Sequence, residues 1–245
     1  MNVRPATDAD IPAITAILEA NDEPVSWPDV PRPPYVVHLL TRPATRVVVG
    51  ELDGSVAGVA ASIEVGSAER RFLSDLYVDP TRQSRGLGRA MLDEVLAGAS
   101  ERMTFSSSDR RALAAYIRNG MRPWWPLLYL EIGPGTLGDE ERGVEARPAD
   151  AAETADHSRT WTGIDRSADF AFYAGLPDAD PIRSAIAVLQ AASRGERVGA
   201  AVPGPHPAVG ALLERGVRFG DADTHCATDR ELLDPTRIFP SPGTL

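Results

Sequence analysis

The sequence predicts an α/β (α+β) fold followed by a smaller, partial repeat of the same unit, and three observations support this. First, β-rich runs alternate with segments whose apolar residues recur at helical spacing. Second, Asp53-Gly54 joins two of the β-rich runs through a hairpin turn signal. Third, two short patterns of the first half return in the second half. The 245 residues are 43% hydrophobic, which is enough for a sizeable buried core.

The first half begins with a strand and a helix. Residues 3–5 fit a short strand, and Thr7 and Asp10 stand at capping-box spacing, with Asp in place of Glu. The apolar residues that follow mark one face of a helix: Ile11, Ile14, Ile17 and Leu18. Prolines interrupt residues 20–45, so we expect any helix there to be confined to Tyr35–Leu40.

Strands and two helices make up the rest of the first half. The hairpin consists of Arg46–Glu51 and Ser55–Val65, and a third strand, Arg71–Val78, stops at Asp79-Pro80. The next helix carries an apolar face: Leu87, Met91, Leu92, Val95 and Leu96. After it we expect a strand over Arg102–Ser107, a helix capped by Ser108 or Asp109 and ended by Gly120, and a strand over Pro126–Ile132.

The second half echoes the first. Residues 4–10 match residues 147–153 at an offset of 143, and residues 112–122 match residues 208–218 at an offset of 96. The second copy is therefore 47 residues shorter in its middle. We predict a domain over residues 1–133, a linker rich in glycine and charge over residues 134–143, and a shortened half over residues 144–245.

One segment carries chemistry. A strand ends at Val78, a glycine-rich turn follows, and a helix begins near Leu87. Unpaired backbone N–H groups at such a helix start converge on one spot, and the helix dipole adds positive charge there. Gly86 and Gly88 allow a ligand to approach the backbone, so we expect a diphosphate cradle flanked by two cations, Arg85 and Arg89.

The whole pattern is more specific than its glycines. Gln83-x-x-Gly86-x-Gly88, directly after Leu76-Tyr77-Val78-Asp79-Pro80, resembles the acetyl-coenzyme A signature of the GNAT superfamily of N-acetyltransferases. The resemblance covers about residues 2–132. It implies a mixed, mostly antiparallel sheet flanked by helices, with acetyl-coenzyme A as co-substrate. The signature does not recur after residue 143, so the layout resembles a tandem GNAT protein with a degenerate second half packed on the first.

The resemblance also assigns roles to residues. The pantetheine arm would bind along the exposed backbone of the strand that precedes the signature, at Leu76, Tyr77 and Val78. Gln83 belongs to the signature, and the turn would hold the pyrophosphate through Ser84, Arg85, Gly86, Leu87, Gly88 and Arg89.

Three residues are candidates for proton transfer. Tyr116 precedes Gly120 by four residues, as a tyrosine does in many relatives, and would be the acid for the departing thiolate; its other interpretation is a core aromatic. Asp75 resembles the acidic position on this strand in many relatives, and Glu51 ends the preceding strand. Each carboxylate would accept the amine's proton or attract a cationic substrate, or would simply be a solvated or hydrogen-bonded strand residue. A water chain is the alternative base.

Composition excludes several classes of function. A net charge of −10 argues against nucleic acid as a partner. No apolar run approaches the roughly 20 residues that span a bilayer, and the N-terminus does not resemble a signal peptide, so we expect no membrane partner and a cytoplasmic location. The four histidines lack metal-ligand spacing, so no metal is expected, and Cys226 is interpreted as a packed strand residue.

The predicted function is acetyl-coenzyme A-dependent N-acetylation of a primary amine, on a small molecule or a peptide, by direct attack on the thioester. The alternative is a non-catalytic acyl-coenzyme A sensor or partner-binding module. A donor longer than acetyl also fits the sequence. The chain would be a monomer with an internal pseudo-repeat or a homodimer.

Overall fold

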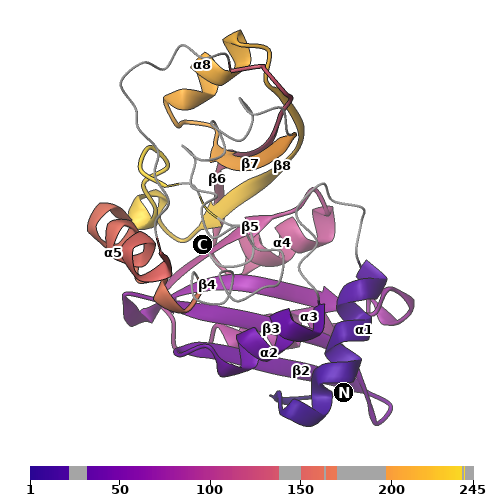
Figure 1. The fold of residues 1–245 in the computed structure, drawn as a ribbon. Coiled ribbons are helices and arrows are strands. Elements are labelled where there is room, and N and C mark those ends of the chain that lie inside the picture. The colour runs from indigo at the N-terminus through magenta and orange to yellow at the C-terminus, as the bar shows by residue number, and fades with distance from the viewer. Residues whose placement is uncertain (22–31, 138–149, 163, 170–196, 239, 241–245) are drawn as a thin grey trace. The chain divides into compact units, whose positions relative to one another are not determined.

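A computed structural model describes residues 1–21, 32–137, 150–162, 164–169, 197–238 and 240 (Figure 1). The chain forms two compact units that interleave along the sequence. Unit 1 contains Met1–Thr104, Ala114–Arg122 and Ala227–Asp229, and unit 2 contains Phe105–Leu113, Pro123–Cys226 and Arg230–Leu245. The units do not follow one another along the chain. The domain boundaries predicted at residues 133 and 143 therefore remain a prediction.

The sheet of unit 1 has the strand order β1-β2-β3-β4-β5. Its strands are β1 (Asn2–Pro5), β2 (Thr45–Leu52), β3 (Ser55–Val65), β4 (Ser67–Val78) and β5 (Glu101–Ser106). Neighbouring strands from β1 to β4 are antiparallel, and β5 runs parallel to β4. The predicted α/β fold with a mostly antiparallel sheet flanked by helices is therefore confirmed.

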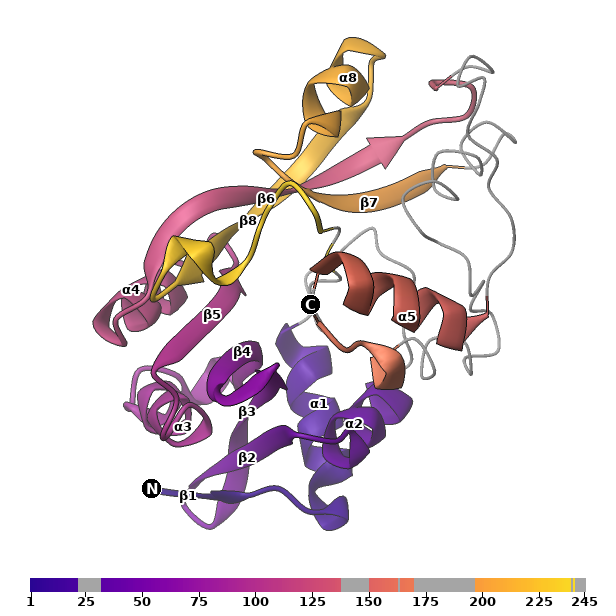
Figure 2. The same cartoon turned by 90° about the vertical axis from the view of Figure 1, so that its left-hand side faces the viewer.

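Helices cover both faces of this sheet. Helices α1 (Ile11–Asn21) and α2 (Arg32–Thr41) lie on one face, and α3 (Leu87–Val95) lies on the other (Figure 2). Helix α3 packs closely because strand glycines face it. A Cβ on Gly50 would lie 2.6 Å from Leu87 Cδ1, and one on Gly58 would lie 2.5 Å from Met91 Cε. These two strand glycines thus set the distance between α3 and the sheet.

Three strands of unit 2 are neighbours in the sheet, in the order β8-β6-β7. They are β6 (Arg122–Ile132), β7 (Val198–Pro203) and β8 (Arg218–Ala227), with the helices α5 (Ala151–Thr162) and α8 (Ala208–Glu214). One cluster of buried apolar side chains packs together in this unit: Leu130, Ile132, Leu137, Val202, Val209, Leu212 and Val217. Helix α4 (Arg110–Arg118) contributes residues to both units.

The two sequence echoes correspond to equal local structures. Gly120 and Gly216 have φ of 87° and 84°, and each ends its helix in a Schellman motif. The next residue's N–H donates to the carbonyl five residues back, from Met121 to Tyr116 and from Val217 to Leu212, both at 3.1 Å. At the other echo, Thr7 and Asp150 occupy the same position before a helix.

The two helix starts use the same pair of positions, but the hydrogen bond runs in opposite directions. Asp10 Oδ2 accepts the backbone N–H of Thr7 at 2.8 Å, as the capping-box spacing predicted. Asp150 Oδ1 accepts the backbone N–H of Glu153 at 2.8 Å. Residues 147–149 of this echo lie outside the described residues, as does most of the predicted linker.

One predicted element needs correction. The helix expected over Tyr35–Leu40 extends over Arg32–Thr41. Pro33 and Pro34 lie in its first turn, where backbone N–H groups have no intrahelical acceptor, so proline is tolerated there. The strand predicted from Arg71 begins earlier, at Ser67, and Cys226 is a buried strand residue, as expected.

Candidate functional site

The turn between β4 and α3 contains the residues of the predicted cradle. Gly86 is the residue before the helix and has the left-handed conformation, with φ 81° and ψ −3°. Ser84 also has a positive φ, 67°. The first intrahelical bond runs from Ala90 N to Gly86 O at 3.1 Å, so helix geometry leaves the N–H groups of residues 87–89 for other acceptors. Gly86 has no side chain to cap them, and this donor set fits the oxygens of a diphosphate.

An arginine outside the predicted set anchors this turn. The guanidinium of Arg82 donates to Ser55 Oγ at 2.7 Å and to the carbonyl of Leu52, both in the turn of the β2–β3 hairpin. Asp79 holds the other side of the turn, since Thr81 donates to its Oδ1 from the hydroxyl at 2.7 Å and from the backbone at 2.9 Å. These bonds lower the pKa of Asp79. These hydrogen bonds stabilise the turn that precedes α3.

Strand β4 changes its pairing where the pantetheine arm is expected. Its parallel ladder with β5 runs from Arg70↔Glu101 to Leu73↔Thr104. On its other side the register with β3 shifts between Ala61↔Asp75 and Ser62↔Leu73, which leaves Ser74 as a bulge. Leu76, Tyr77 and Val78 thus lie beyond the end of the β4–β5 ladder while they pair with β3.

Two side-chain amides meet at the end of this strand. Gln83, from the signature, and Asn21, the last residue of α1, each donate from the side-chain nitrogen to the carbonyl of Val78 at 3.3 Å. They join the signature turn, the strand end and α1. This contact gives Gln83, a residue of the signature, a structural role at the end of β4.

The two cations of the turn are exposed. Arg85 Nη1 lies 3.5 Å from Asp53 Oδ2, and Arg89 Nε lies 3.7 Å from Asp93 Oδ2, one turn further along α3. Exposed ion pairs of this kind are weak, so both guanidinium groups are available to a phosphate. Leu87 differs from them because its side chain is buried against the sheet, and only its backbone N–H faces the cradle.

Asp75 forms a buried pair with a residue that the sequence did not single out. Tyr35 Oη on α2 donates to Asp75 Oδ2 at 2.9 Å. The two residues are 7% and 6% exposed. Asp75 directly precedes the strand end at Leu76, so it is the predicted carboxylate that lies nearest in the chain to the expected pantetheine site.

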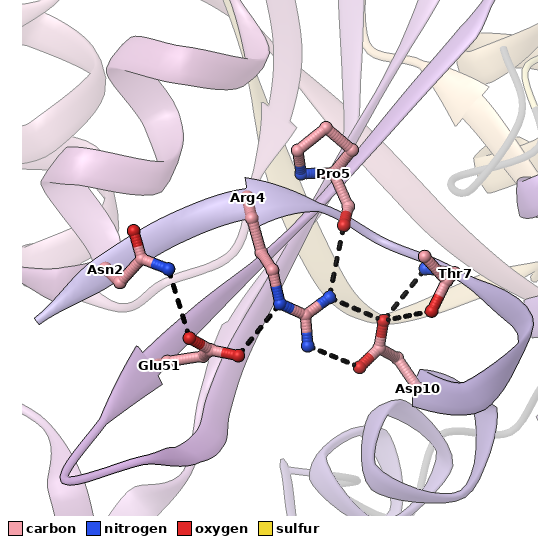
Figure 3. Close-up of polar contacts among 6 residues, drawn as sticks. All are labelled: Asn2, Arg4, Pro5, Thr7, Asp10 and Glu51. Atoms are coloured by element: carbon pink, nitrogen blue, oxygen red, sulfur yellow. Dashed lines mark hydrogen bonds and ion pairs between the residues drawn. The ribbon is translucent and has the colours of Figure 1, made fainter.

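Glu51 has a different environment (Figure 3). Its carboxylate accepts from Arg4 Nε at 2.8 Å and from Asn2 Nδ2 at 3.1 Å, and Arg4 also makes a bidentate pair with Asp10 at 2.8 Å. The hydrogen bonds of Asn2 and Arg4 lower the pKa of Glu51, and those of Arg4 hold the pKa of Asp10 well below its usual range. A lowered pKa makes a carboxylate a weaker base, so these contacts indicate a structural link between β1, β2 and the 3-10 helix Asp8–Asp10 that precedes α1.

The structure does not bring the two candidate carboxylates together. Glu51 pairs with Val56 of β3, and Asp75 pairs with Ala61 of the same strand. Five residues of strand separate these partners, which is about 17 Å along β3. Glu51 and Asp75 therefore cannot act on the same proton.

Tyr116 lies near the end of α4 and is 6% exposed. The last turn of this helix is fixed from two sides. Asn119 donates from Nδ2 to Asp93 Oδ1 of α3 at 3.0 Å, and it accepts from Arg102 Nη1 of β5 at 2.6 Å. Tyr116 is thus held about one helical turn from the contact between α4 and α3.

Sequence reasoning missed Tyr35, Arg82, Asn21, Gly50 and Gly58. Only the glycines carried a signal, since glycine inside a strand often marks the close approach of another element. Tyr35 and Arg82 act through partners 40 and 27 residues away, and no local pattern reports such contacts.

Two searches of the described residues complete this picture. No group of three or more His, Cys, Asp and Glu side chains within them is arranged to hold a metal ion. None of the described helices has the length and apolar character needed to cross a membrane.

Comparison with known proteins relates part of the chain to one family. Residues 14–121 match the model of the acetyltransferase (GNAT) family. The structure of a Pyrococcus horikoshii protein described as a candidate acetyltransferase is similar over 96% of this chain and 92% of its own, with 14% identity and a TM-score of 0.70. At that identity the similarity concerns the fold. A search of curated proteins found no match.

Shorter structures match about half of the chain. The ribosomal-protein-alanine N-acetyltransferase of Brucella melitensis is 23% identical over 52% of this chain and 88% of its own, with a TM-score of 0.43. A Salmonella typhimurium protein, described as a candidate acetyltransferase with its cofactor acetyl-coenzyme A, is 23% identical over 52% of this chain and 83% of its own, with a TM-score of 0.42.

Proposed function

From the match of residues 14–121 to the model of the acetyltransferase (GNAT) family, we propose that the chain is an acetyl-coenzyme A-dependent N-acetyltransferase. The acceptor is a primary amine, on a small molecule or a peptide. The observation that carries the proposal is the start of α3, where Gly86 in the left-handed conformation leaves backbone donors for a diphosphate.

Two parts of the site would bind two different parts of acetyl-coenzyme A. The cradle comprises Ser84, Arg85, Gly86, Leu87, Gly88 and Arg89, and it would hold the pyrophosphate through backbone N–H groups and two guanidinium groups. The backbone of Leu76, Tyr77 and Val78 would bind the pantetheine arm as an added strand does. Neither step needs a metal ion.

The reaction is then a direct transfer. The amine nitrogen attacks the thioester carbonyl, the C–N bond forms, and the C–S bond breaks. The ammonium proton leaves to Asp75 or to water, and Tyr116 gives its hydroxyl proton to the coenzyme A thiolate. Products are the acetamide and free coenzyme A, and the deprotonated tyrosine is reprotonated from solvent.

A Tyr116→Phe variant tests the chemistry separately from binding. We expect calorimetry to give the same affinity for acetyl-coenzyme A, because the ring stays in its buried position. We expect thiol release with the best amine of a panel to fall about 100-fold, the usual contribution of a general acid. Leu212 occupies the corresponding position in the second echo, so a Leu212→Met variant, conservative in volume, serves as the control and should keep full activity.

The outcomes separate two functions. If the wild-type chain binds acetyl-coenzyme A but releases no thiol with any amine, the protein is a sensor or a binding module. If a donor with a longer acyl chain is used faster than acetyl-coenzyme A, the transfer reaction stands and the donor changes. If calorimetry shows no heat with acetyl-coenzyme A, the proposed cradle is wrong.

Domain layout, partners and location extend this proposal. The equal helix ends at Gly120 and Gly216 support a tandem layout, with a coenzyme A-binding half over residues 1–133 and a degenerate half over residues 144–245. We propose a cytoplasmic protein, either a monomer with this pseudo-repeat or a homodimer, without nucleic-acid or membrane partners. Light scattering coupled to size-exclusion chromatography distinguishes the two assembly states.

A further inference from the structure

Three aromatic rings of unit 2 form a cluster that the proposed function does not use. Phe105 lies on β5, His225 on β8 and Trp125 on β6, and these strands are neighbours in the order β5-β8-β6. The imidazole stacks on the indole, with centroids 4.3 Å apart at 20°. The phenyl ring lies 5.6 Å from the imidazole and 5.9 Å from the indole. All three residues belong to unit 2, so the cluster is a feature of one compact unit.

The polar atoms of this cluster have no hydrogen-bond partner in the part of the chain that the structure describes. His225 is 0% exposed and Trp125 is 8% exposed. Nothing bonds to Nδ1 or Nε2 of the imidazole, or to Nε1 of the indole. Folded proteins pair nearly all of their buried polar groups, because an unpaired group loses its hydration without compensation. Three such atoms on two stacked rings therefore indicate a bound ligand.

The rings are separate from the apolar cluster of unit 2. Leu130 and Ile132 of β6 belong to that cluster, together with Val202 and Val209. Side chains alternate along a strand, so Trp125 points to the opposite face of β6. A side chain that only fills space needs no polar atom, and burying an unpaired nitrogen costs free energy that an aliphatic or phenyl group avoids. The nitrogens of these rings therefore require an explanation other than packing.

The rings define the chemistry of the ligand. An indole N–H only donates, whereas a neutral imidazole donates from one nitrogen and accepts at the other. The ligand must therefore carry at least one acceptor and one donor. Both rings form hydrogen bonds in their own planes, and the planes are within 20° of parallel, which suits a flat polar group. Phe105 adds an apolar surface beside the two polar rings, which suits an aromatic ligand.

The surroundings disfavour a charged ligand. Burial lowers the pKa of His225 to about 4, so the imidazole is neutral at pH 7 and carries no charge for an anion. Asp223 lies two residues before His225 on β8, and its carboxylate accepts from Tyr129 Oη at 2.5 Å. Burial raises the pKa of Asp223, so a further charge in this region is costly. A neutral ligand avoids that cost.

We propose that the polar edges of His225 and Trp125 form a binding site for a small, planar, uncharged ligand that carries a hydrogen-bond acceptor beside a donor, as an aromatic carboxamide does. The ligand's acceptor receives the indole N–H, and its donor bonds to the unprotonated nitrogen of the imidazole. Its apolar part packs on Phe105. Binding here needs neither coenzyme A nor the transfer reaction, so the site is a function beyond the one proposed above.

Benzamide is the probe, titrated into the full-length protein labelled with ¹⁵N. The four tryptophans give one indole N–H resonance each, and Trp125→Phe identifies the resonance of Trp125 by its loss. We expect benzamide to shift this resonance to saturation. His225→Phe should weaken the binding at least about 10-fold, because one hydrogen bond is lost. Toluene, which lacks the amide, and benzoate, which is charged, should cause much smaller shifts at the same concentration.

Trp124→Phe is the matched control. It makes the same chemical change at the neighbouring residue, which points to the other face of β6 and is 39% exposed. This variant should bind benzamide as the wild type does. Urea unfolding checks that each variant folds. If His225→Phe is unstable, the three titrations of the wild type still decide the question, since they compare ligands and need no substitution.

Three results would overturn the inference. If benzamide leaves the Trp125 resonance unchanged up to its solubility limit, the ring nitrogens bind internal water only. If toluene or benzoate binds as tightly as benzamide, the polar edges of the rings do not select an uncharged amide. If a folded His225→Phe variant keeps the wild-type affinity for benzamide, the imidazole is not part of the site.

Discussion

At the scale of single residues, the surroundings decide what an ionisable group can do. Glu51 and Asp75 are both strand carboxylates of unit 1, yet Arg4 pairs with the first and the hydroxyl of Tyr35 with the second. An arginine partner stabilises the ionised form and makes a poor base. The two strand carboxylates therefore differ in these partners, a cation for Glu51 and a hydroxyl group for Asp75.

His225 in unit 2 is a second residue whose surroundings determine its behaviour. Its ring stacks on Trp125, with centroids 4.3 Å apart at 20°, and Phe105 lies 5.6 Å away. Neither ring nitrogen has a hydrogen-bond partner among the described residues. Burial lowers the pKa of His225 from 6.5 to about 4.

From the lowered pKa of His225 we predict that the protein loses stability in acid. The folded state favours neutral His225, so its contribution is complete above pH 6.5 and is lost as the pH falls through about 4. The shift corresponds to about 3 kcal/mol. Urea unfolding followed by tryptophan fluorescence between pH 7.5 and 4.5 should show this decline, and His225→Phe should flatten it. The exposed His157, replaced by Gln, is the control, and an unchanged slope in His225→Phe would contradict the assignment.

At the scale of elements, α3 is held at its C-terminal end and along its length. At its C-terminal end, Arg46 Nη1 donates to the carbonyls of Val95 at 3.3 Å and Ala97 at 2.9 Å, and Ser62 Oγ donates to Val95 O at 2.8 Å. A cation at this end also complements the helix dipole. The free end of α3 is the one that begins at Gly86. The helix is thus fixed so that its donors stay aimed at the cradle.

The strand glycine beneath α3 should be intolerant of a methyl group. In Gly58→Ala, the Cβ would lie 2.9 Å from the carbonyl oxygen of Tyr77, a backbone atom that cannot move freely. We expect a loss of about 1–3 kcal/mol in the free energy of unfolding, and weaker binding of acetyl-coenzyme A because β4 and α3 shift. Chemical denaturation and calorimetry measure the two effects.

Gly210→Ala is the matched control for this substitution. Gly210 lies within α8, and nothing stands within 4 Å of its added Cβ. The same chemical change should therefore stabilise the protein by about 0.5–1 kcal/mol. If Gly58→Ala is as stable as the wild type, the close packing of α3 on the sheet does not require glycine.

At the scale of the whole molecule, segments distant in the sequence complete each compact unit. Unit 1 includes Ala227–Asp229, which come from near the end of the chain. Thr228 N donates to Arg102 O at 2.9 Å, and Thr228 Oγ1 accepts from Arg102 N at 3.0 Å. The C-terminal part of the chain therefore contributes hydrogen bonds to β5.

This arrangement predicts that a fragment of residues 1–133 will be less stable than unit 1 of the full chain. Both backbone groups of Arg102 lose their partner in the fragment, so β5 should exchange its amide hydrogens faster. Hydrogen exchange of the Arg102 amide measures this directly. Thr228→Ala in the full chain, which removes only the side-chain acceptor, should cause a smaller increase. Equal protection in fragment and full chain would support an independent domain that ends at residue 133.

Much of the fold could be predicted from the sequence because its signals are local. Asp53-Gly54 predicted the hairpin, and Asp79-Pro80 predicted the end of β4. The spacing from Gln83 to Gly88 predicted the start of α3. Turn residues act through their own backbone conformation, so they need no distant partner. The backbone part of the candidate site was predictable for the same reason.

The sequence by itself determined the order of elements, the backbone cradle at Gly86 and the two equal helix ends at Gly120 and Gly216. Only the tertiary structure decided the partners of the candidate carboxylates, since Glu51 contacts Arg4 and Asp75 contacts Tyr35 across 47 and 40 residues of sequence. A bulge at one strand residue set the face of Asp75. Strand register, the face to which a side chain points and its hydrogen-bond partners all depend on how strands and helices pack. Short-range sequence patterns do not contain that information.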